Sequence, residues 1–386
     1  MASILMVIEA RIATTYLLEQ IMGACRLHGV DYEVKFLNEL KVDDITPNII
    51  PMFVRCADPL VLSWTQLLAD ANRSYIYYID DNFWRIRGES PLAMYYRHPL
   101  VRKSLEFAVS HAETVIVNSP ELAAFVSRYN TRVAVLPAFF DFSLIEGVAQ
   151  SANEEIRIGF AGSPSRVDDL DLIEPLIEPV LKRFPQTIFE FAGVLPRGVV
   201  PGARVRFFPH TGDYAAYIRF QASRNWAIGL APLVDHEANR GKTDNKYREY
   251  GACCISGVYT NIPPYKNVVK NYETGILVEN GTESWLKALS ILIESPRKRE
   301  DIGCMAFNDV KLRYDLHFVS YEWARLFKCL DEMRSKDIKP LVHGGFGWKT
   351  ILRKAERYAI YLYISYNDGG IYSVSRKIAR KLKVVP

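Results

Sequence analysis

The amino-acid sequence predicts an α/β protein with two domains, each built on a parallel β-sheet. Its length of 386 residues exceeds that of one ordinary domain and suits two domains of about 150–200 residues. Short runs rich in β-branched and aromatic residues alternate with segments of helical periodicity, which is typical of parallel sheets covered by helices. Hydrophobic residues make up 49% and charged residues 24% of the chain. That composition excludes a disordered chain, a collagen-like repeat and a small disulfide-stapled scaffold.

The first 150 residues alternate predicted strands with predicted helices. The strands are expected over residues 3–8, 31–36, 49–54, 75–79, 114–117 and 132–136. Helical patterns occupy much of the chain between them, for example residues 14–28 and 100–110. Loops at the carboxyl ends of parallel strands line the ligand crevice of such folds. The polar residues at those ends are Glu9, Arg11, Arg55, Asp80, Asp81, Asn118 and Ser119.

The same pattern begins again after a polar stretch at residues 147–155, which resembles a linker. Further strands are expected over residues 156–160, 187–192, 205–208, 226–231, 254–257 and 275–278. One helix is expected from residue 163 to about residue 184, and helices over residues 284–330 close this half. The predicted division is a first domain of residues 1–150, a second domain of residues 151–332 and a C-terminal tail of residues 333–386.

The cysteines and the N-terminus indicate a cytoplasmic protein. The six cysteines include no CxxC pair and no Cys/His ligand spacing, so we expect reduced thiols. The apolar N-terminus has no preceding basic residues and no small-residue cleavage site, which favours a first strand over a signal peptide. No window approaches 18 consecutive apolar residues, so we expect no membrane-spanning helix.

The net charge of +4 is distributed unevenly. Residues 334–386 hold 12 Lys/Arg and 3 Asp/Glu, a charge of +9, which leaves −5 for the rest of the chain. Residues 348–383 combine helical apolar spacing, basic residues and many tyrosines, which predicts contact with an anionic membrane surface, here the inner face of the membrane. The alternative is a helix that packs back across the first domain. No recognition motif accompanies the charge, so no nucleic-acid partner is expected.

The turn at Gly162 and Ser163 follows the strand that opens the second half. A strand that leads through a Gly-Ser turn into a helix N-terminus exposes backbone N–H groups and is suited to binding phosphate. The alternative is an ordinary helix start with a serine cap and acidic residues in its first turn. Asp169 and Asp171 form a DxD motif that can hold a metal ion, but their place in that first turn favours a structural role. We therefore expect no metal site.

The segment around Lys242, Lys246 and Glu249 begins at the carboxyl end of the predicted strand 226–231. If the segment is helical, the two lysines lie on one face, where their charges repel and an anion would justify them. Glu249 lies on a similar face, and a carboxylate beside diphosphate-binding lysines can accept hydrogen bonds from a ribose. The alternative is a solvated helix with a Lys246–Glu249 ion pair.

Asp80 and Asp81 follow directly after the predicted strand 75–79. Mutual repulsion between two adjacent carboxylates raises the pKa of one of them toward that of a general base. The alternative is that one of them caps the next element. Arg11 and Arg55, at the ends of neighbouring strands, are further candidates for binding a substrate on this side.

Several segments together resemble glycosyltransferases of the GT-B fold, closest to the family-four-like enzymes that build bacterial surface polysaccharides. The resemblance covers about residues 1–330. In the second half it rests on residues 158–164, 228–233, 242–252, 263–265, 272–278 and 285–289. In the first half it rests on residues 79–84, 115–119, 133–137 and Asp141.

The resemblance implies two Rossmann-like domains that face a central cleft, followed here by the basic helical tail. It implies that the second domain binds a nucleotide-sugar donor, with Glu249 on the ribose and Lys242, Lys246 and the Gly162–Ser163 turn near the diphosphate. The first domain is then expected to bind a glycan or lipid-linked acceptor. Two positions depart from the family: Gly241 stands where a second glutamate is frequent, and Cys254 stands where glycine is usual.

The chemistry implied by the resemblance is sugar transfer without a metal or other cofactor. Lysines and a helix N-terminus stabilise the negative charge that develops on the leaving diphosphate. If the enzyme retains configuration, as family-four-like enzymes do, the donor phosphate deprotonates the acceptor and Asp80 or Asp81 positions it. If it inverts, one of the two is the candidate general base. The alternatives are a nucleotide-sugar epimerase of the same fold and a catalytically inactive subunit of a polysaccharide assembly complex.

Overall fold

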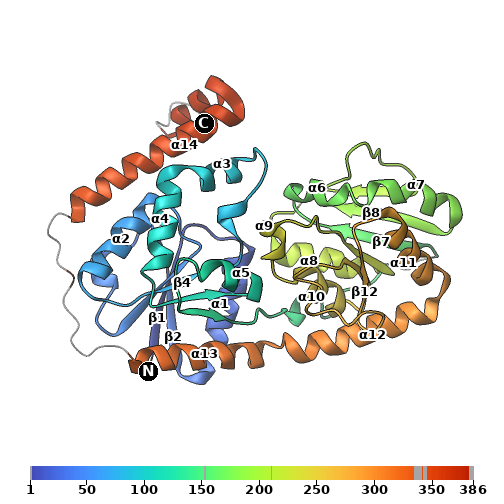
Figure 1. Cartoon of the computed structure of the whole chain (residues 1–386), viewed down its shortest axis with the longest axis horizontal. Helices are drawn as coiled ribbons and strands as arrows, with labels where there is room; N and C mark the ends of the chain where they lie inside the picture. Colours follow the sequence, from blue (N-terminus) through green and yellow to red (C-terminus); the bar gives the residue numbers. More distant parts are fainter. Residues whose placement is uncertain (1, 152–153, 210, 334–340, 342–345, 382–386) are drawn as a thin grey trace. The chain divides into compact units, whose positions relative to one another are not determined.

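The computed structural model describes residues 2–151, 154–209, 211–333, 341 and 346–381, with side chains up to residue 368. The chain divides into two compact units (Figure 1). Unit 1 contains Met1–Leu136 and Ser320–Pro386, and unit 2 contains Pro137–Val319. The chain therefore leaves unit 1 once and returns to it.

Unit 1 is built on a six-stranded parallel sheet. Its strands are β1 (Ala2–Ile8), β2 (Val30–Phe36), β3 (Ile49–Val54), β4 (Ile76–Tyr78), β5 (Thr114–Val117) and β6 (Val133–Val135). Their order in the sheet is β2-β1-β3-β4-β5-β6, and every neighbouring pair is parallel. The chain changes direction across the sheet between β1 and β3. In such sheets ligands bind outside the carboxyl ends of the strands at this switch point.

Helices cover the sheet of unit 1 on both faces. They are α1 (Ala13–Cys25), α2 (Pro59–Asp70), α3 (Pro91–Arg97), α4 (Pro99–Ser110), α5 (Pro120–Val126) and α14 (Phe346–Lys381). Helix α2 begins at Pro59 because Asp58 caps it: the Leu60 N–H donates to the Asp58 carboxylate at 2.9 Å, and proline is favoured at the first helical position.

Unit 2 repeats this architecture. Its strands are β7 (Ile156–Ala161), β8 (Thr187–Ala192), β9 (Val205–Phe208), β10 (Ile228–Ala231), β11 (Ser256–Thr260) and β12 (Ile276–Val278). They form a second six-stranded parallel sheet in the order β12-β11-β10-β7-β8-β9, with its switch point between β7 and β10. The prediction of two α/β units with parallel sheets is therefore confirmed.

The helices of unit 2 are shorter than the sequence predicts where they approach the switch point. They are α6 (Val167–Leu170), α7 (Glu174–Arg183), α8 (Tyr214–Ser223), α9 (Glu237–Arg240), α10 (Asn245–Ala252), α11 (Thr282–Glu294) and α12 (Pro296–Arg313). The single helix predicted from 163 to about 184 is interrupted between α6 and α7. One cause is Asp169, whose buried carboxylate accepts the Val234 N–H at 2.8 Å and holds α6 against the loop after β10.

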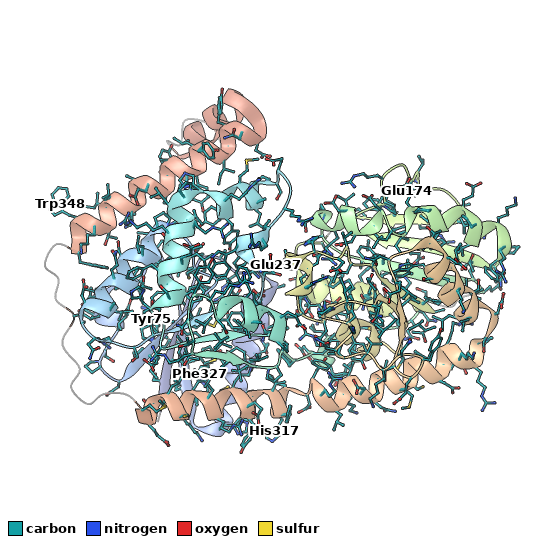
Figure 2. All side chains as sticks on the ribbon, in the orientation of Figure 1. Tyr75, Glu174, Glu237, His317, Phe327 and Trp348 are labelled. Carbon is teal, nitrogen blue, oxygen red and sulfur yellow. The ribbon has the colours of Figure 1, made fainter. Side chains whose placement is uncertain are left out.

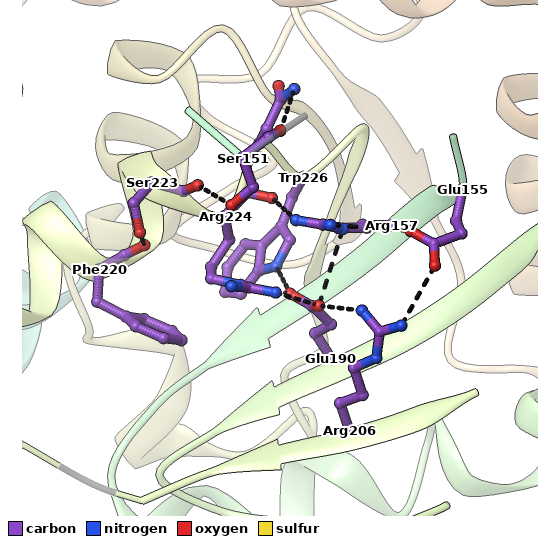
Figure 3. Close-up of polar contacts among 10 residues, drawn as sticks. Ser151, Glu155, Arg157, Glu190, Arg206, Phe220, Ser223, Arg224 and Trp226 are labelled. Atoms are coloured by element: carbon purple, nitrogen blue, oxygen red, sulfur yellow. Dashed lines mark hydrogen bonds and ion pairs between the residues drawn. The ribbon is translucent and has the colours of Figure 1, made fainter. Parts of the chain in front are cut away.

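The buried carboxylate of Glu190 lies at the centre of a polar cluster on the second sheet (Figure 3). Glu190 on β8 is fully buried and accepts hydrogen bonds from Arg224 at 2.9 and 2.6 Å and from the Trp226 indole at 2.9 Å. Arg157 and Arg206, from the flanking strands, lie within 3.9 and 3.5 Å of the same carboxylate. Hydrogen bonds and charge from Arg224 outweigh burial and lower the pKa of Glu190 below its usual 4.5.

The C-terminal part of the chain packs on unit 1. Helix α13 (Leu316–Met333) reaches unit 1 at Ser320, and α14 contacts α2 and α3. Ile360 and Ile364 of α14 are buried in the core of unit 1. The Arg357 guanidinium forms an ion pair of 2.9 Å with the Asp58 carboxylate. Residues 369–383, which include the basic run predicted for membrane contact, lie outside the described side chains.

None of the helices built from the described residues is both long enough and apolar enough to cross a membrane.

Candidate functional site

The Gly162–Ser163 turn lies at the switch point of unit 2, directly after β7. The Gly162 N–H donates to the Ala192 carbonyl at 3.0 Å and so belongs to the sheet. A Cβ at Gly162 would lie 2.9 Å from the Phe160 ring, so this close turn requires glycine. Ser163 is exposed, and its hydroxyl is 2.8 Å from that of Ser165. The turn leads into a short 3-10 segment, Pro164–Arg166, before α6.

The DxD residues are engaged by protein groups. Asp169 accepts hydrogen bonds from the Val234 N–H and from the Asn239 amide at 3.1 Å, and pairs with Arg166 at 3.2 Å. Asp171 pairs with Arg197. The contacts of Asp169 with Val234 and Asn239 tie α6 to the loop after β10 and to α9. Among the described residues, no group of three or more His, Cys, Asp or Glu side chains is arranged to hold a metal ion.

Lys246, Glu249 and Tyr217 form a compact, partly buried cluster that joins α8 to α10 in unit 2. Glu249 is 5% exposed on α10, and its Oε2 accepts hydrogen bonds from the Lys246 ammonium at 2.7 Å and from the Tyr217 hydroxyl at 2.8 Å. Lys246 also donates to the Tyr217 oxygen at 2.8 Å. Burial and the neighbouring Glu249 charge raise the pKa of Tyr217, so its hydroxyl stays protonated.

One oxygen of the Glu249 carboxylate remains available. Both side-chain donors converge on Oε2, and no donor among the described residues reaches Oε1. The alternative interpretation of a Lys246–Glu249 pair is therefore correct as to the contact, but both side chains are largely buried, so the pair does not lie on a solvated face.

Lys242 lies in the turn between α9 and α10, outside the helix that carries Lys246. The one-face arrangement considered for a continuous helix is therefore wrong, because the helix is interrupted at residues 241–244. The Lys242 N–H donates to the Asn239 carbonyl at 3.2 Å, and its side chain is half-buried. Gly241 is buried in the same turn.

Asp80 and Arg55 meet at the carboxyl ends of β4 and β3 in unit 1. The Arg55 guanidinium lies 3.0 Å from Asp80 Oδ1 and 3.6 Å from Asp81 Oδ2. The Thr14 hydroxyl donates to Asp80 Oδ2 at 2.7 Å. The Arg55 guanidinium also lies over the Phe83 ring, 4.7 Å from its centre. Three predicted residues, Arg55, Asp80 and Asp81, are thus brought together.

Burial and neighbouring charges act on the pKa of Asp80 in opposite directions. Burial and the Asp81 charge raise the pKa of Asp80, while the Arg55 charge opposes that shift. Arg55 has a positive φ of 55°, a conformation that is uncommon for a residue with a side chain. Strained backbone of this kind concentrates at functional sites.

Arg11 does not join the cluster of Arg55, Asp80 and Asp81. It pairs with Glu19, and its side chain is 61% exposed.

Glu9 is a residue that the sequence places at the end of the first strand but not among the candidate site residues. It follows β1 at the switch point, and its Oε1 accepts the backbone N–H groups of Ala57 and Asp58 at 2.6 and 2.7 Å. Burial, together with the nearby Asp58 charge, raises the pKa of Glu9 to about 7. The partners come from a distant loop, so spacing in the sequence gives no sign of them. The strand order, which places β1 beside β3, is the missing information.

No protein-family model and no curated protein matches the sequence. Solved structures do match over most of the chain. Sucrose-phosphate synthase from Thermosynechococcus elongatus is 13% identical, with a TM-score of 0.63, over 86% of this chain and 100% of that chain. Anabaena HepE in complex with UDP-glucose is 13% identical, with a TM-score of 0.60, over 85% and 99%.

A glycosyltransferase from Rickettsia africae is also 13% identical, with a TM-score of 0.55, over 86% of this chain and 99% of that chain. These identities are too low to carry more than the architecture. The chain therefore has the GT-B fold of these glycosyltransferases, as its sequence predicts.

Proposed function

We propose that the protein is a glycosyltransferase that uses a nucleotide-sugar donor. Unit 2 binds the donor at its β7/β10 switch point, and unit 1 binds a glycan or lipid-linked acceptor. The observation that carries the proposal is Glu249 Oε1, a carboxylate oxygen with no donor among the described residues, at the ligand end of a GT-B sheet. Vicinal ribose hydroxyls supply the donors that it lacks. HepE, which shares the fold, is solved with UDP-glucose.

The cluster around Glu249 suits a nucleoside diphosphate. Lys246 neutralises Glu249 and holds its Oε2, which leaves Oε1 to accept from the ribose. Lys242, in the turn before α10, and the tight turn at Gly162 and Ser163 are the candidate contacts for the diphosphate. Charge that develops on the leaving diphosphate is stabilised by such preorganised groups, and we propose that transfer needs no metal ion. Retention of the anomeric configuration is part of the same proposal.

A thermal-shift panel of UDP-, GDP-, dTDP- and CMP-sugars tests the donor site. At least one nucleotide should raise the melting temperature, because a ligand that binds only the folded state stabilises it. Glu249→Ala should weaken that nucleotide about 10- to 100-fold, the effect of losing hydrogen bonds to a charged group. Glu283→Ala, which removes an exposed glutamate on α11, is the matched control. No stabilisation by any nucleotide would contradict the proposal.

The reaction itself is tested by its product. Transfer of the sugar to a glycan distinguishes a glycosyltransferase from an epimerase of the same fold, which releases an altered sugar nucleotide or free sugar. Proton NMR of the new anomeric centre decides between retention and inversion. Activity that survives in EDTA supports metal-independent transfer, and loss of activity restored by a divalent cation would contradict it.

We further propose that the protein is a cytoplasmic enzyme and that α14 docks it on the anionic inner face of the membrane. One face of α14 is buried on unit 1, and the opposite face exposes Trp348 by 79% and Ile351 and Leu352 by 58% each. Figure 2 shows the Trp348 side chain pointing away from the helices that α14 packs against. Lys349 and Lys354 are exposed on the same helix, which gives charge complementarity to anionic lipids.

Vesicle co-sedimentation tests this surface. The wild type should sediment with phosphatidylserine-containing vesicles and not with phosphatidylcholine vesicles. Replacing Trp348, Ile351 and Leu352 by serine should abolish sedimentation because it removes the apolar contact. Leu312→Ser, at a leucine that is 77% exposed on α12, is the control and should have no effect. Undiminished sedimentation of the triple variant would contradict the proposal.

A further inference from the structure

Glu9 occupies the switch point of the first sheet in an unusual way. The two N–H groups that precede α2 point at its carboxylate, at 2.6 and 2.7 Å. Amide groups at such a position commonly bind an external anion. Here the chain fills the position with its own carboxylate, which is thereby fixed in place at the ligand end of the sheet.

Only one oxygen of the Glu9 carboxylate accepts hydrogen bonds from the described residues. Both amides donate to Oε1, and no donor among the described residues reaches Oε2. Asp80 differs, because Arg55 lies within 3.0 Å of one of its oxygens and Thr14 and Arg55 donate to the other at 2.7 and 3.1 Å. Asp80 Oδ1 also has no hydrogen-bond donor among the described residues, but it is buried and faces the Arg55 cation. Glu9 Oε2 has neither a donor nor an ion-pair partner among the described residues, and it is therefore the oxygen that we assign to a substrate hydroxyl.

A chain of contacts links Glu9 to the C-terminal helix. Asp58, whose N–H holds Glu9, caps α2 with its carboxylate and pairs with Arg357 of α14 at 2.9 Å. The Asp58 side chain is almost fully buried, so solvent does not reach the carboxylate of this ion pair. Ile360, one turn further along α14, is buried in the same core and fixes the position of the helix.

We propose that Glu9 binds a hydroxyl group of the acceptor, and that Asp58 and Arg357 are positioning residues that hold its carboxylate in place. This inference rests on the proposed glycosyltransferase function and adds the acceptor contact to it. The ligand is a hydroxyl-rich group such as a sugar. The two amides fix the carboxylate through Oε1, and Oε2 is left to accept a hydrogen bond from a neutral donor such as a hydroxyl.

The charged and titratable groups that face Glu9 have opposing effects. Asp58, before α2, raises the pKa of Glu9, whereas Arg357 of α14 lowers it. Cys56 before α2, Tyr77 on β4, and Tyr95 and Tyr96 on α3 are also close enough to interact with its charge. Burial raises the pKa of each of these groups, so they remain neutral near pH 7.

The test uses the full chain and the nucleotide sugar identified by thermal shift. Transfer to a panel of p-nitrophenyl hexosides is measured between pH 5.5 and 8.5, and hydrolysis of the donor, in which water takes the place of the acceptor, is measured in parallel. Glu9→Gln should lower kcat/KM for the acceptor, or the hydrolysis rate, about 10- to 100-fold, because it replaces a charged acceptor of a hydrogen bond with a neutral one. Nucleotide affinity should not change.

Two further variants separate a substrate contact from a merely structural role. The wild-type acidic limb should have its midpoint near pH 7, the pKa of Glu9. Asp58→Asn still caps α2 but removes a negative charge, so the limb should move to lower pH. Arg357→Met removes a positive charge, so the limb should move to higher pH. Glu33→Gln, at an exposed glutamate on β2, is the matched control and should leave the profile unchanged.

The outcomes are distinct. Wild-type kcat/KM and an unchanged acidic limb in Glu9→Gln would overturn the inference while leaving the donor site intact. Shifts of the limb in the same direction in Asp58→Asn and Arg357→Met would also overturn it. If the wild type binds no nucleotide, the proposed function fails and this inference fails with it.

Discussion

Glu190 is the clearest case in which one residue determines local stability. It is fully buried in β8 and is held by Arg224 and the Trp226 indole, with two further arginines nearby. Its pKa in the folded protein lies below the value of 4.5 expected when unfolded. The stabilisation from this shift is complete above pH 4.5 and is lost as the pH falls below that value through the lowered pKa.

Glu190→Gln should reduce the free energy of unfolding by about 3–5 kcal/mol at pH 7, because it leaves buried arginines without their counter-charge. The loss should shrink when urea unfolding is repeated at pH 3.5, because this pH lies below the pKa of 4.5 that Glu190 has in the unfolded chain. Glu178→Gln on α7, at an exposed glutamate, should change stability by no more than about 0.5 kcal/mol. An equal loss at both pH values would contradict the electrostatic explanation.

Cys254 shows the cost of one unusual residue. It follows α10 with a φ of 55°, and its N–H donates to the Gly251 carbonyl at 3.0 Å. This left-handed position after a helix favours glycine, which is the residue that the resembled family usually has there. Cys254→Gly should raise the free energy of unfolding by about 1 kcal/mol, measured by urea titration. Cys304→Ala, at an exposed cysteine in α12, serves as the control; a destabilised Cys254→Gly would contradict this explanation.

At the scale of elements, the sheets were the most predictable part of the molecule. Strands β1, β3, β5 and β8 lie within one residue of their predicted ranges, because continuous apolar runs bounded by polar turns identify buried parallel strands. The interrupted helices at the second switch point were not predicted. Their ends depend on Asp169 and its contact with Val234, 65 residues away, and local periodicity carries no information about such a contact.

For the candidate site, too, the sequence predicts some residues and misses the partners that are distant in sequence. The sequence offered Asp80, Arg55 and Glu249 as candidates because each follows a strand or belongs to a recognisable segment. It did not identify Glu9 or Tyr217 as partners in those clusters, since both contacts join residues that are distant in sequence. Strand order is the property that brings them together, and it is not encoded in the spacing of any one motif.

A substitution at Gly159 tests how closely β7 packs against the Trp226 ring. A Cβ at this position would lie 1.9 Å from the Trp226 ring, so the indole that binds Glu190 would have to move. Gly159→Ala should therefore lower stability by about 2–3 kcal/mol, as overpacking does. Gly202→Ala has open space and should change stability by about 0.5 kcal/mol or less. Urea unfolding compares the two, and equal effects would show that the contact is easily relieved.

At the scale of the whole molecule, α14 is part of unit 1. Ile360→Ala, at a side chain that is 1% exposed, should cost about 2–4 kcal/mol because it leaves a cavity in that core. Nucleotide affinity, which we propose to be a property of unit 2, should be unchanged in a binding titration. Ile351→Ala, on the exposed face of the same helix, should cost less than about 0.5 kcal/mol. A similar cost for both would mean that α14 does not contribute to the core.

The return of the chain to unit 1 at Ser320 has a consequence for synthesis on the ribosome. Domains generally fold as units while the chain emerges, the N-terminal one first. In this molecule the order is reversed, because unit 2 is complete once Val319 has emerged, whereas unit 1 still lacks Ile360 and Ile364 of its core. The apolar surface of unit 1 that Ile360 and Ile364 cover therefore stays exposed in the nascent chain until this part of α14 has been made.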